Sequence, residues 1–402
     1  MRNILKTGIF LTLKSVFRGN LRISLMTILM MSLVFINLLF APALLNGLID
    51  TINGKLRESI TSDIILDSTS EDGYIQDADK FIGEISEIDG VDSATSRTNI
   101  GAEILYQKSK SSYGITVVSP ESEKRVFDIE NYLVEGEFLE EDDEGQIVLG
   151  VQIAGRGDKS LELYSSSLKD VHVGDVVTVK FSNGLEQEMK VKGIFDMDFI
   201  QIDTLSLINQ KEYESINLQL KNTARQVNLK LEEGYDLDSM VVRIRNEFPD
   251  IEARSWKELA GIVESMTQSF EIIIIILRVI ALLVAAITIL IVTYVDLTNK
   301  RRQIGIQRAI GIIPETIILT YVLRAAFYSM VGTLVGALTF MFIIVPVEHN
   351  HPFTFPFGDV LMSIDYSQML NFFVTLMIVS TIAALVPTIN TIRIKILDAI
   401  WS

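Results

Sequence analysis

Residues 23–49 read ISLMTILMMSLVFINLLFAPALLNGLI and contain no charged side chain. An α-helix of this length extends about 40 Å, more than the roughly 30 Å hydrocarbon layer of a membrane. A signal peptide is the alternative, because Ala41 and Ala43 resemble a cleavage site. The apolar part of a signal peptide is only about 7–15 residues long, however. We therefore predict a transmembrane helix at residues 23–49.

Three further apolar stretches have the same character. Residues 272–295 are interrupted only by Arg278, residues 317–347 contain Arg324, and residues 366–392 are uncharged. Each is long enough to cross a bilayer as a helix, which satisfies its own backbone hydrogen bonds in lipid. The sequence predicts four transmembrane helices.

The distribution of charge predicts their orientation. Basic residues gather in segments 1–22, 296–316 and 393–402, which we place in the cytoplasm. Residues 50–270 instead carry 44 acidic and 22 basic side chains, and the short loop 348–365 carries three acidic residues and no basic one. We expect both of these segments outside the cytoplasm and both chain termini inside it.

The average composition excludes several classes of protein. The 402 residues have 49% apolar content, a mean hydropathy of +0.35 and a net charge of −16. A disordered chain is less apolar, and a nucleic-acid-binding protein is typically basic. The chain has no cysteine, so it has neither disulfide bonds nor thiol chemistry.

The external segment predicts an α+β domain. Apolar spacing indicates a helix at 77–88, while β-branched residues indicate strands at 171–181, 187–195 and 226–231. Asn183-Gly184 is typical of a hairpin turn between the first two strands. A helix marked by Leu237, Val241, Ile244 and Phe248, followed by a short strand up to Trp256, closes the domain.

Two helices are expected to carry this domain as a stalk. No proline or glycine interrupts residues 262–304, so one helix is predicted over 257–303. The first span also continues outward, because apolar residues recur at helical spacing beyond it: Leu45, Leu48, Ile52, Leu56 and Ile60. A flexible apolar tether is the alternative. At the N-terminus, residues 1–22 predict an amphipathic helix on the cytoplasmic membrane surface, or otherwise a solvated basic leader.

The predicted fold is therefore an α-helical membrane protein with four transmembrane helices. A large α+β extracytoplasmic domain, residues 50–270, is inserted between helices 1 and 2 on a two-helix stalk. The remaining parts are a cytoplasmic segment at 296–316, an external loop at 348–365 and a cytoplasmic tail at 393–402.

The search for catalytic chemistry gives no supported site. The chain lacks a P-loop motif, so it does not bind nucleotide in that way. Glu348, His349 and His351 suggest a metal site, but a solvated loop is the better interpretation. The acidic run 140–144 suggests calcium, yet it lacks EF-hand spacing and a charged turn is favoured. We expect a non-catalytic protein without catalytic residues, metal or cofactor of its own.

Two arginines inside the apolar stretches are candidates for function. Arg278 and Arg324 each lie a few residues inside the stretch, so each either contributes to a substrate or ion site or extends to the membrane interface. Gly332 and Gly336 form a small-residue face that predicts close helix packing, within the chain or with a second copy.

Residues 300–311, KRRQIGIQRAIG, followed by Pro314, carry a more specific signal. They resemble the cytoplasmic segment of the FtsX-like, or MacB-type, ABC transporter permeases, although Gln303 stands where that family usually has glutamate. Residues 132–138 (YLVEGEF), 147–150 (IVLG) and 191–195 (VKGIF) resemble the family's periplasmic core domain. A weaker similarity to lipoprotein-releasing permeases lies in Asn46-Gly47 and residues 62–65.

The resemblance implies a permease subunit in the cytoplasmic (inner) membrane. A separate cytoplasmic P-loop ATPase would bind ATP, and a second permease subunit, identical or not, would complete a dimer among the membrane lipids. Mechanotransmission would extrude or extract a hydrophobic substrate such as a lipoprotein, lipid or peptide. The alternative is an FtsX-like mechanotransducer that activates a cell-envelope hydrolase; an adaptor is a further possible partner, and nucleic acid is not. The implied ATPase-coupling residues are Arg301, Arg302, Gln303, Ile304, Gly305, Arg308, Ala309, Gly311 and Glu315.

Overall fold

The computed structural model describes residues 10–12, 21–156, 166–216, 221–355 and 358–393. They divide into two compact units. The helical unit comprises residues 1–48, 266–353 and 360–402, and the sheet unit comprises residues 49–265 and 354–359. The helix expected over 1–22 and the tail 393–402 lie mostly outside the described residues.

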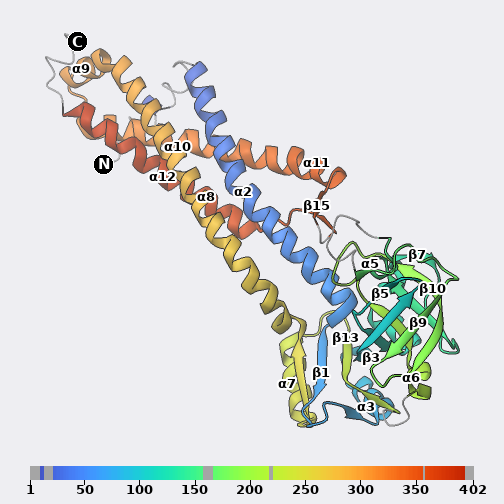
Figure 1. Cartoon of the computed structure of the whole chain (residues 1–402). Helices are drawn as coiled ribbons and strands as arrows, with labels where there is room; N and C mark the ends of the chain where they lie inside the picture. The colour runs from blue at the N-terminus through green and yellow to red at the C-terminus, as the bar shows by residue number, and fades with distance from the viewer. Residues whose placement is uncertain (1–9, 13–20, 157–165, 217–220, 356–357, 394–402) are drawn as a thin grey trace. The chain divides into compact units, whose positions relative to one another are not determined.

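The helical unit contains long apolar helices that lie side by side (Figure 1). Four helices of the described chain are long and apolar enough to cross a membrane, over Arg22–Thr61, Ile272–Asn299, Pro314–Asn350 and Tyr366–Ile392, which confirms the predicted number. The elements are α2 (Leu21–Leu56), α8 (Trp256–Asn299), α9 (Arg301–Ala309), α10 (Pro314–Thr339), the π-helical turn η5 (Phe340–Ile344), α11 (Val345–Asn350) and α12 (Tyr366–Ile392).

Helices α2, α8, α10 and α12 share one apolar core. Met31 and Phe35 of α2 pack with Ala285 of α8 and Leu376 of α12, and all four side chains are at most 1% exposed. Small residues such as Ala285 let helix backbones approach closely in lipid, where burial of apolar surface supplies no net driving force.

The loop before α12 also returns to α2. Ser363 N donates a hydrogen bond to Ala43 O at 3.0 Å, and Met362 N donates to Glu348 Oε1 at 2.8 Å. A Cβ atom added to Gly47 would lie 1.9 Å from Leu361 O, so only glycine fits beneath this loop. Buried Glu348 thus ties the loop to α11, while Ser363 ties it to α2, and a solvated position for Glu348 is wrong.

The sheet unit is built on a twelve-stranded mixed sheet. Its path runs β14-β1-β13-β3-β6-β11-β8-β10-β9-β4-β5, with β7 paired to β10. The β6–β11 and β8–β10 pairs are parallel, and the other strand pairs described in this sheet are antiparallel. Its strands are β1 (Ile64–Ser68), β3 (Val91–Ile100), β4 (Ala102–Tyr106), β5 (Ser109–Ser111), β6 (Ile115–Val118), β7 (Leu133–Gly136), β8 (Gln146–Gly150), β9 (Val176–Phe181), β10 (Glu186–Phe195), β11 (Ser206–Asn209), β13 (Gln226–Leu231) and β14 (Ile251–Ser255).

Short helices and two small sheets complete the unit. The helices are η1 (Arg57–Thr61), α3 (Ala78–Ser86), α4 (Pro120–Val126), η2 (Ile129–Tyr132), α5 (Val151–Ala154), α6 (Gln210–Ile216) and α7 (Leu237–Glu247). The small sheets pair β2 (Ile75–Gln76) with β12 (Thr223–Ala224) and β15 (Phe353–Phe355) with β16 (Gly358–Val360).

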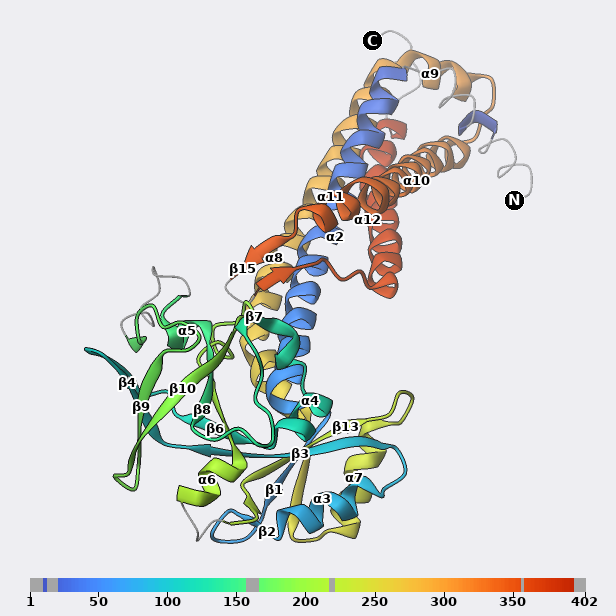
Figure 2. The same cartoon turned by 90° about the vertical axis from the view of Figure 1, so that its right-hand side faces the viewer.

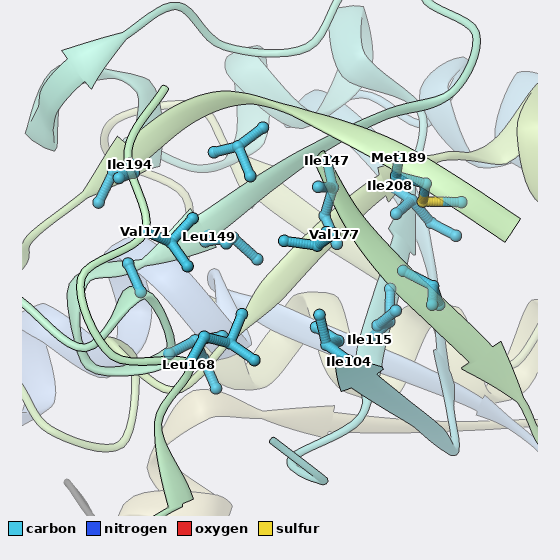
Figure 3. Packing of buried hydrophobic residues seen from close by; sticks show 14 of the residues in the cluster. Ile104, Ile115, Ile147, Leu149, Leu168, Val171, Val177, Met189, Ile194 and Ile208 are labelled. Carbon is cyan, nitrogen blue, oxygen red and sulfur yellow. The ribbon is translucent and has the colours of Figure 1, made fainter. Parts of the chain in front are cut away.

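Three apolar clusters stabilise the sheet unit, and two of them show how its strands and helices pack. Figure 3 shows the first, in which Ile147, Leu149 and Val177 pack between strands. In the second, α3 and α7 lie beside one another next to β1 and β13 (Figure 2), and the rings of Phe81 and Phe248 meet edge to face at 5.4 Å.

The local predictions for this unit are largely confirmed. Helices α3 and α7 and strands β10, β13 and β14 form where expected, and Gly184 turns the β9–β10 hairpin with φ of +85°. The strand expected from residue 171 instead begins at Val176. His172 N donates to Asp175 Oδ2 at 2.9 Å, and Gly174 has φ of +93°, so a turn occupies these residues.

Candidate functional site

The basic segment after the second span forms a short separate helix. Helix α8 ends at Asn299, Lys300 leaves the helical conformation, and α9 covers Arg301–Ala309. The prediction of one helix through residue 303 is therefore wrong at its end. Gly311, with φ of +99°, terminates the segment, and Pro314 opens α10. A proline is well suited to the first turn of a helix, where its missing N–H needs no partner.

One face of α9 is packed into the helical unit. Ile304 is 4% exposed and contacts a cluster that includes Leu297, Ile317, Tyr321 and Ile392, contributed by α8, α10 and α12. Gly305 is also buried. The change of direction at Lys300 brings this face back onto the ends of the spanning helices, so a displacement of α9 would act on all three.

The other face of α9 and the following turn are exposed. Among the implied coupling residues, Arg302, Gln303, Ala309, Gly311 and Glu315 are exposed, while Arg301 and Arg308 are half-buried. Ile306, Ile310 and Ile313 lie among them and are 47%, 74% and 44% exposed. Isoleucine next to arginine on a projecting surface is typical of a protein contact, in which an apolar centre has a charged rim.

A buried ionic network lies next to the start of α9. Asp296 pairs with Arg324 and with Lys300, the latter at 3.2 Å. Arg324 Nε donates to Tyr328 Oη at 2.8 Å, and Tyr328 Oη lies 2.7 Å from Ser24 Oγ. The network joins α8, α10 and α2.

The environment of Arg324 decides between the two interpretations of this residue. Its side chain is 4% exposed and that of Asp296 is 8% exposed, so Arg324 is paired with a carboxylate inside the helical unit and does not extend to the surface of that unit. Sequence reasoning missed Asp296 because it follows the apolar stretch 272–295 and looked like part of a solvated flank. The sequence does contain a signal for this pair: an aspartate at the end of one predicted span and an arginine near the start of the next.

The two glycines of α10 face α2. A Cβ atom added to Gly332 would lie 2.5 Å from Met31 Cβ, and one added to Gly336 would lie 2.9 Å from Ser32 O. Real Cβ atoms essentially never approach to 2.5 Å, so these glycines set how closely α10 and α2 pack. In this structure the small-residue face contacts its own chain.

Within the sheet unit, the end of α2 is held by hydrogen bonds. Arg97 Nη1 donates to Ser59 O at 2.6 Å, and its Nε donates to Glu123 at 3.0 Å. Asn228 Nδ2 donates to Thr61 O at 3.0 Å. The residues of this clamp come from β3, α4 and β13 and are at most 6% exposed, so η1 is fixed to three elements of the sheet unit.

The described residues offer no metal centre, since no group of three potential ligands is found among them. The acidic run 140–144 forms a turn in which Asp143 pairs with Lys192 at 2.6 Å. His172 is half-exposed beside Glu135 and Asp170, at 3.7 and 3.4 Å. This arrangement contains no nucleophile.

Comparisons with known proteins agree with this architecture. Residues 275–396, which include α9, match the family described as FtsX-like permease C-terminal. An ABC transporter permease of Methanocaldococcus jannaschii is 24% identical over 264 residues, covering 64% of this chain and 63% of the relative. HrtB of Staphylococcus haemolyticus, whose name describes a hemin transport system permease, is 26% identical over 239 residues, covering 58% of this chain and 60% of that protein. The chain thus spans less than two thirds of either relative.

Two solved structures are similar to the sheet-containing part. The periplasmic region of MacB from Actinobacillus actinomycetemcomitans aligns with a TM-score of 0.37 and 12% identity over 52% of this chain and 95% of that one. The extracellular domain of YknZ from Gram-positive bacteria aligns with a TM-score of 0.35 and 10% identity over 48% of this chain and 99% of that one.

Proposed function

We propose that this chain, a multi-pass membrane protein that carries an FtsX-like permease domain, is the membrane subunit of an ABC transporter. A separate P-loop ATPase would bind and hydrolyse ATP, and this chain would need no cofactor or catalytic residue of its own. The membrane would be the cytoplasmic one, with both termini inside and the sheet unit outside.

The exposed face of α9 is the observation that carries the proposal. It places isoleucines and arginines together on a helix whose opposite face is packed against α8, α10 and α12. A partner that binds Ile306, Ile310 and Arg302 would therefore act directly on the spanning helices. We assign the ATPase to this surface.

Mechanotransmission is the mechanism that the helices support. Helix α8 is continuous over 44 residues, about 66 Å, and its residues belong to both units. Helix α2 is continuous over 36 residues and ends in the Arg97 clamp. A continuous helix carries a displacement along its axis, whereas a flexible linker dissipates it.

The substrate class in this proposal is a hydrophobic molecule such as a lipid, lipoprotein or peptide. Four spanning helices are too few to surround a polar channel, so a substrate would be extracted at the membrane surface, with a second permease subunit opposite the first. Hemin, named for the HrtB relative, is an apolar ring system with two carboxylates and fits the same class.

The second candidate is an FtsX-like mechanotransducer that activates an envelope hydrolase. The same helices favour it, since they transmit motion whether or not a substrate moves. Affinity purification of the full-length protein, with identification of what its sheet unit binds, distinguishes the two functions. Recovery of a hydrolase supports signalling, and recovery of a lipidated substrate supports transport.

The coupling role is tested by substitutions on α9. Purification of the full chain from its native membrane should recover a P-loop ATPase, and Ile310→Asp or Ala309→Asp should abolish both recovery and stimulated ATP hydrolysis. Gly305→Asp should do the same, but Gly305 is buried, so this variant also perturbs packing. Leu185→Asp, half-exposed in the sheet unit, is the matched control. Unchanged assembly and turnover in the Ile310 and Ala309 variants would contradict the proposal.

A further inference from the structure

The two arginines of the apolar stretches have opposite surroundings. Arg324 is paired with Asp296 and bonded to Tyr328. Arg278 has no hydrogen bond or ion pair with any residue described in the structure, and its buried Nε atom lacks a partner. Its one described contact is the ring of Phe372 on α12, 4.8 Å from the guanidinium carbon.

Arg278 lies at the junction of three helices. It is six residues beyond Ile272, about 9 Å from the start of the apolar stretch. Beside it, α2 and α8 enclose a cavity of about 10 Å³, the size of a single water molecule, lined by Asn37, Leu38, Ala41, Pro42, Ile274, Leu277 and Arg278.

Polar groups of α2 face the same place. The Asn37 side chain is exposed on the surface of the helical unit, in the middle of an uncharged span. Pro42 has no N–H, so the carbonyl of Leu38 lacks its usual helical donor. Arg278 and Asn37 together present N–H donors at a surface whose remaining side chains are apolar.

A guanidinium in this position requires a negative partner. It carries a positive charge, and a charged group at membrane depth is unfavourable unless it is paired or hydrated. The Phe372 ring attracts the positive charge of Arg278. It does not accept the hydrogen bonds that the guanidinium N–H groups donate in their own plane. The described residues that line the cavity include no carboxylate, so a ligand with an acidic group would supply the charge that this cavity lacks.

We propose that Arg278 and Asn37 bind the acidic headgroup, a carboxylate or a phosphate, of an amphiphile whose apolar body lies against α2 and α8. Arg278 pairs with two oxygen atoms of the headgroup, and Asn37 donates a further hydrogen bond. Ile274, which is half-buried, and Leu277, which is 44% exposed, contact the apolar body. The source is either an anionic phospholipid of the bilayer or a transported acidic amphiphile.

The test measures ligand binding by the full chain in phosphatidylcholine nanodiscs, without any ATPase. Oleate should bind more tightly than oleyl alcohol, which has the same tail without the charge. Arg278→Gln should weaken oleate binding by about tenfold or more and leave oleyl alcohol unchanged, since a charge-assisted hydrogen bond contributes roughly 1.5–3 kcal/mol. Arg278→Lys should retain part of the affinity, and Arg22→Gln, which removes an exposed arginine at the far end of α2, should have no effect.

The second measurement is native mass spectrometry of the purified chain, which detects phosphatidylglycerol that remains bound to it. Loss of oleate binding alone in Arg278→Gln identifies a transported amphiphile as the source, and loss of phosphatidylglycerol alone identifies the bilayer lipid. Asn37→Leu, on the exposed surface, tests the site if the arginine variant fails to fold. Wild-type affinity for both ligands in the Arg278 and Asn37 variants would show that Arg278 only reaches interfacial water, and would overturn the proposal. Because no ATPase is present, this result is independent of the coupling role of α9.

Discussion

The carboxylate of Asp296 and the guanidinium of Arg324 form an ion pair between α8 and α10 in which both side chains are at most 8% exposed. Lys300, the residue between α8 and α9, contacts the same carboxylate. The start of α9 is therefore tied to a charge pair inside the bundle.

Asp296→Asn should destabilise the helical unit strongly. Removal of one partner leaves Arg324 buried without a countercharge, which costs about 3–5 kcal/mol in comparable pairs. Thermal unfolding in detergent measures the effect. The double variant Asp296→Leu/Arg324→Leu should recover much of the loss, because the buried arginine is removed together with its carboxylate. Lys300→Gln should cost less, since Lys300 is 26% exposed. A double variant less stable than Asp296→Asn alone would contradict this explanation.

Gly336→Leu should separate α10 from α2. The added side chain meets Ser32 O and Phe35 where even a Cβ atom would be 2.9–3.2 Å away, and overpacking of this kind costs typically 1–3 kcal/mol. Disulfide trapping between cysteines placed on α2 and α10 would show the lost proximity. Leu334→Met, on the exposed side of the same helix, is the control and should trap at the wild-type rate.

Gly47→Ala should release the loop that precedes α12. The new Cβ atom would collide with Leu361 O, so the hydrogen bond from Ser363 N to Ala43 O would open. Hydrogen exchange at residues 361–364 should accelerate. Gly54→Ala on the same helix has nothing within 4 Å of the added atom and should be neutral or slightly stabilising. Equal exchange in both variants would rule out this close contact.

The sheet unit should lose stability as the pH rises toward 8. Burial raises the pKa of Asp203 to about 7, and nearby Asp196 and Asp198 contribute in the same direction, whereas hydrogen bonds from Met197 N and Phe199 N oppose the shift. The pKa in the unfolded chain is about 3.9, so the protonated form favours folding. This contribution is fully present below about pH 4 and is lost as the pH rises through 7.

Calorimetry of the detergent-solubilised chain checks this pH dependence. Between pH 5 and pH 8 the contribution of Asp203 amounts to roughly 2–3 kcal/mol. Asp203→Asn does not titrate and should flatten the profile over that range, even if it lowers stability at every pH. An equally steep profile in the variant would assign the dependence to other groups.

Local patterns predicted most of the elements because their causes lie within a few residues. The long apolar stretches predicted four helices long enough to cross a membrane, and Asn183-Gly184 predicted the hairpin. The break at Lys300 was not predictable in this way, because neither proline nor glycine marks it. It follows from the packing of Ile304 on α10 and α12, which lie later in the chain.

Long-range pairing explains the other features that the sequence did not predict. Strand β1 lies between β13 and β14, more than 150 residues away in sequence, and no local pattern encodes that order. For the candidate site, the resemblance predicted coupling residues on α9 and just after it, whereas neither Asp296 nor the Arg97 clamp was predicted. Each depends on a partner from another element, and a single sequence does not reveal which charges meet.

The sheet unit is not one continuous piece of chain, because residues 354–359 belong to it as well as residues 49–265. Gly358 lies against Asp198 within this unit: an added Cβ atom would be 3.3 Å from Asp198 O. During synthesis, domains generally fold from the N-terminus onward. This unit is completed only when residue 359 has left the ribosome, after the helix Pro314–Asn350 has been made. Under the proposed topology, this unit would therefore finish folding only after the third predicted span has been synthesised.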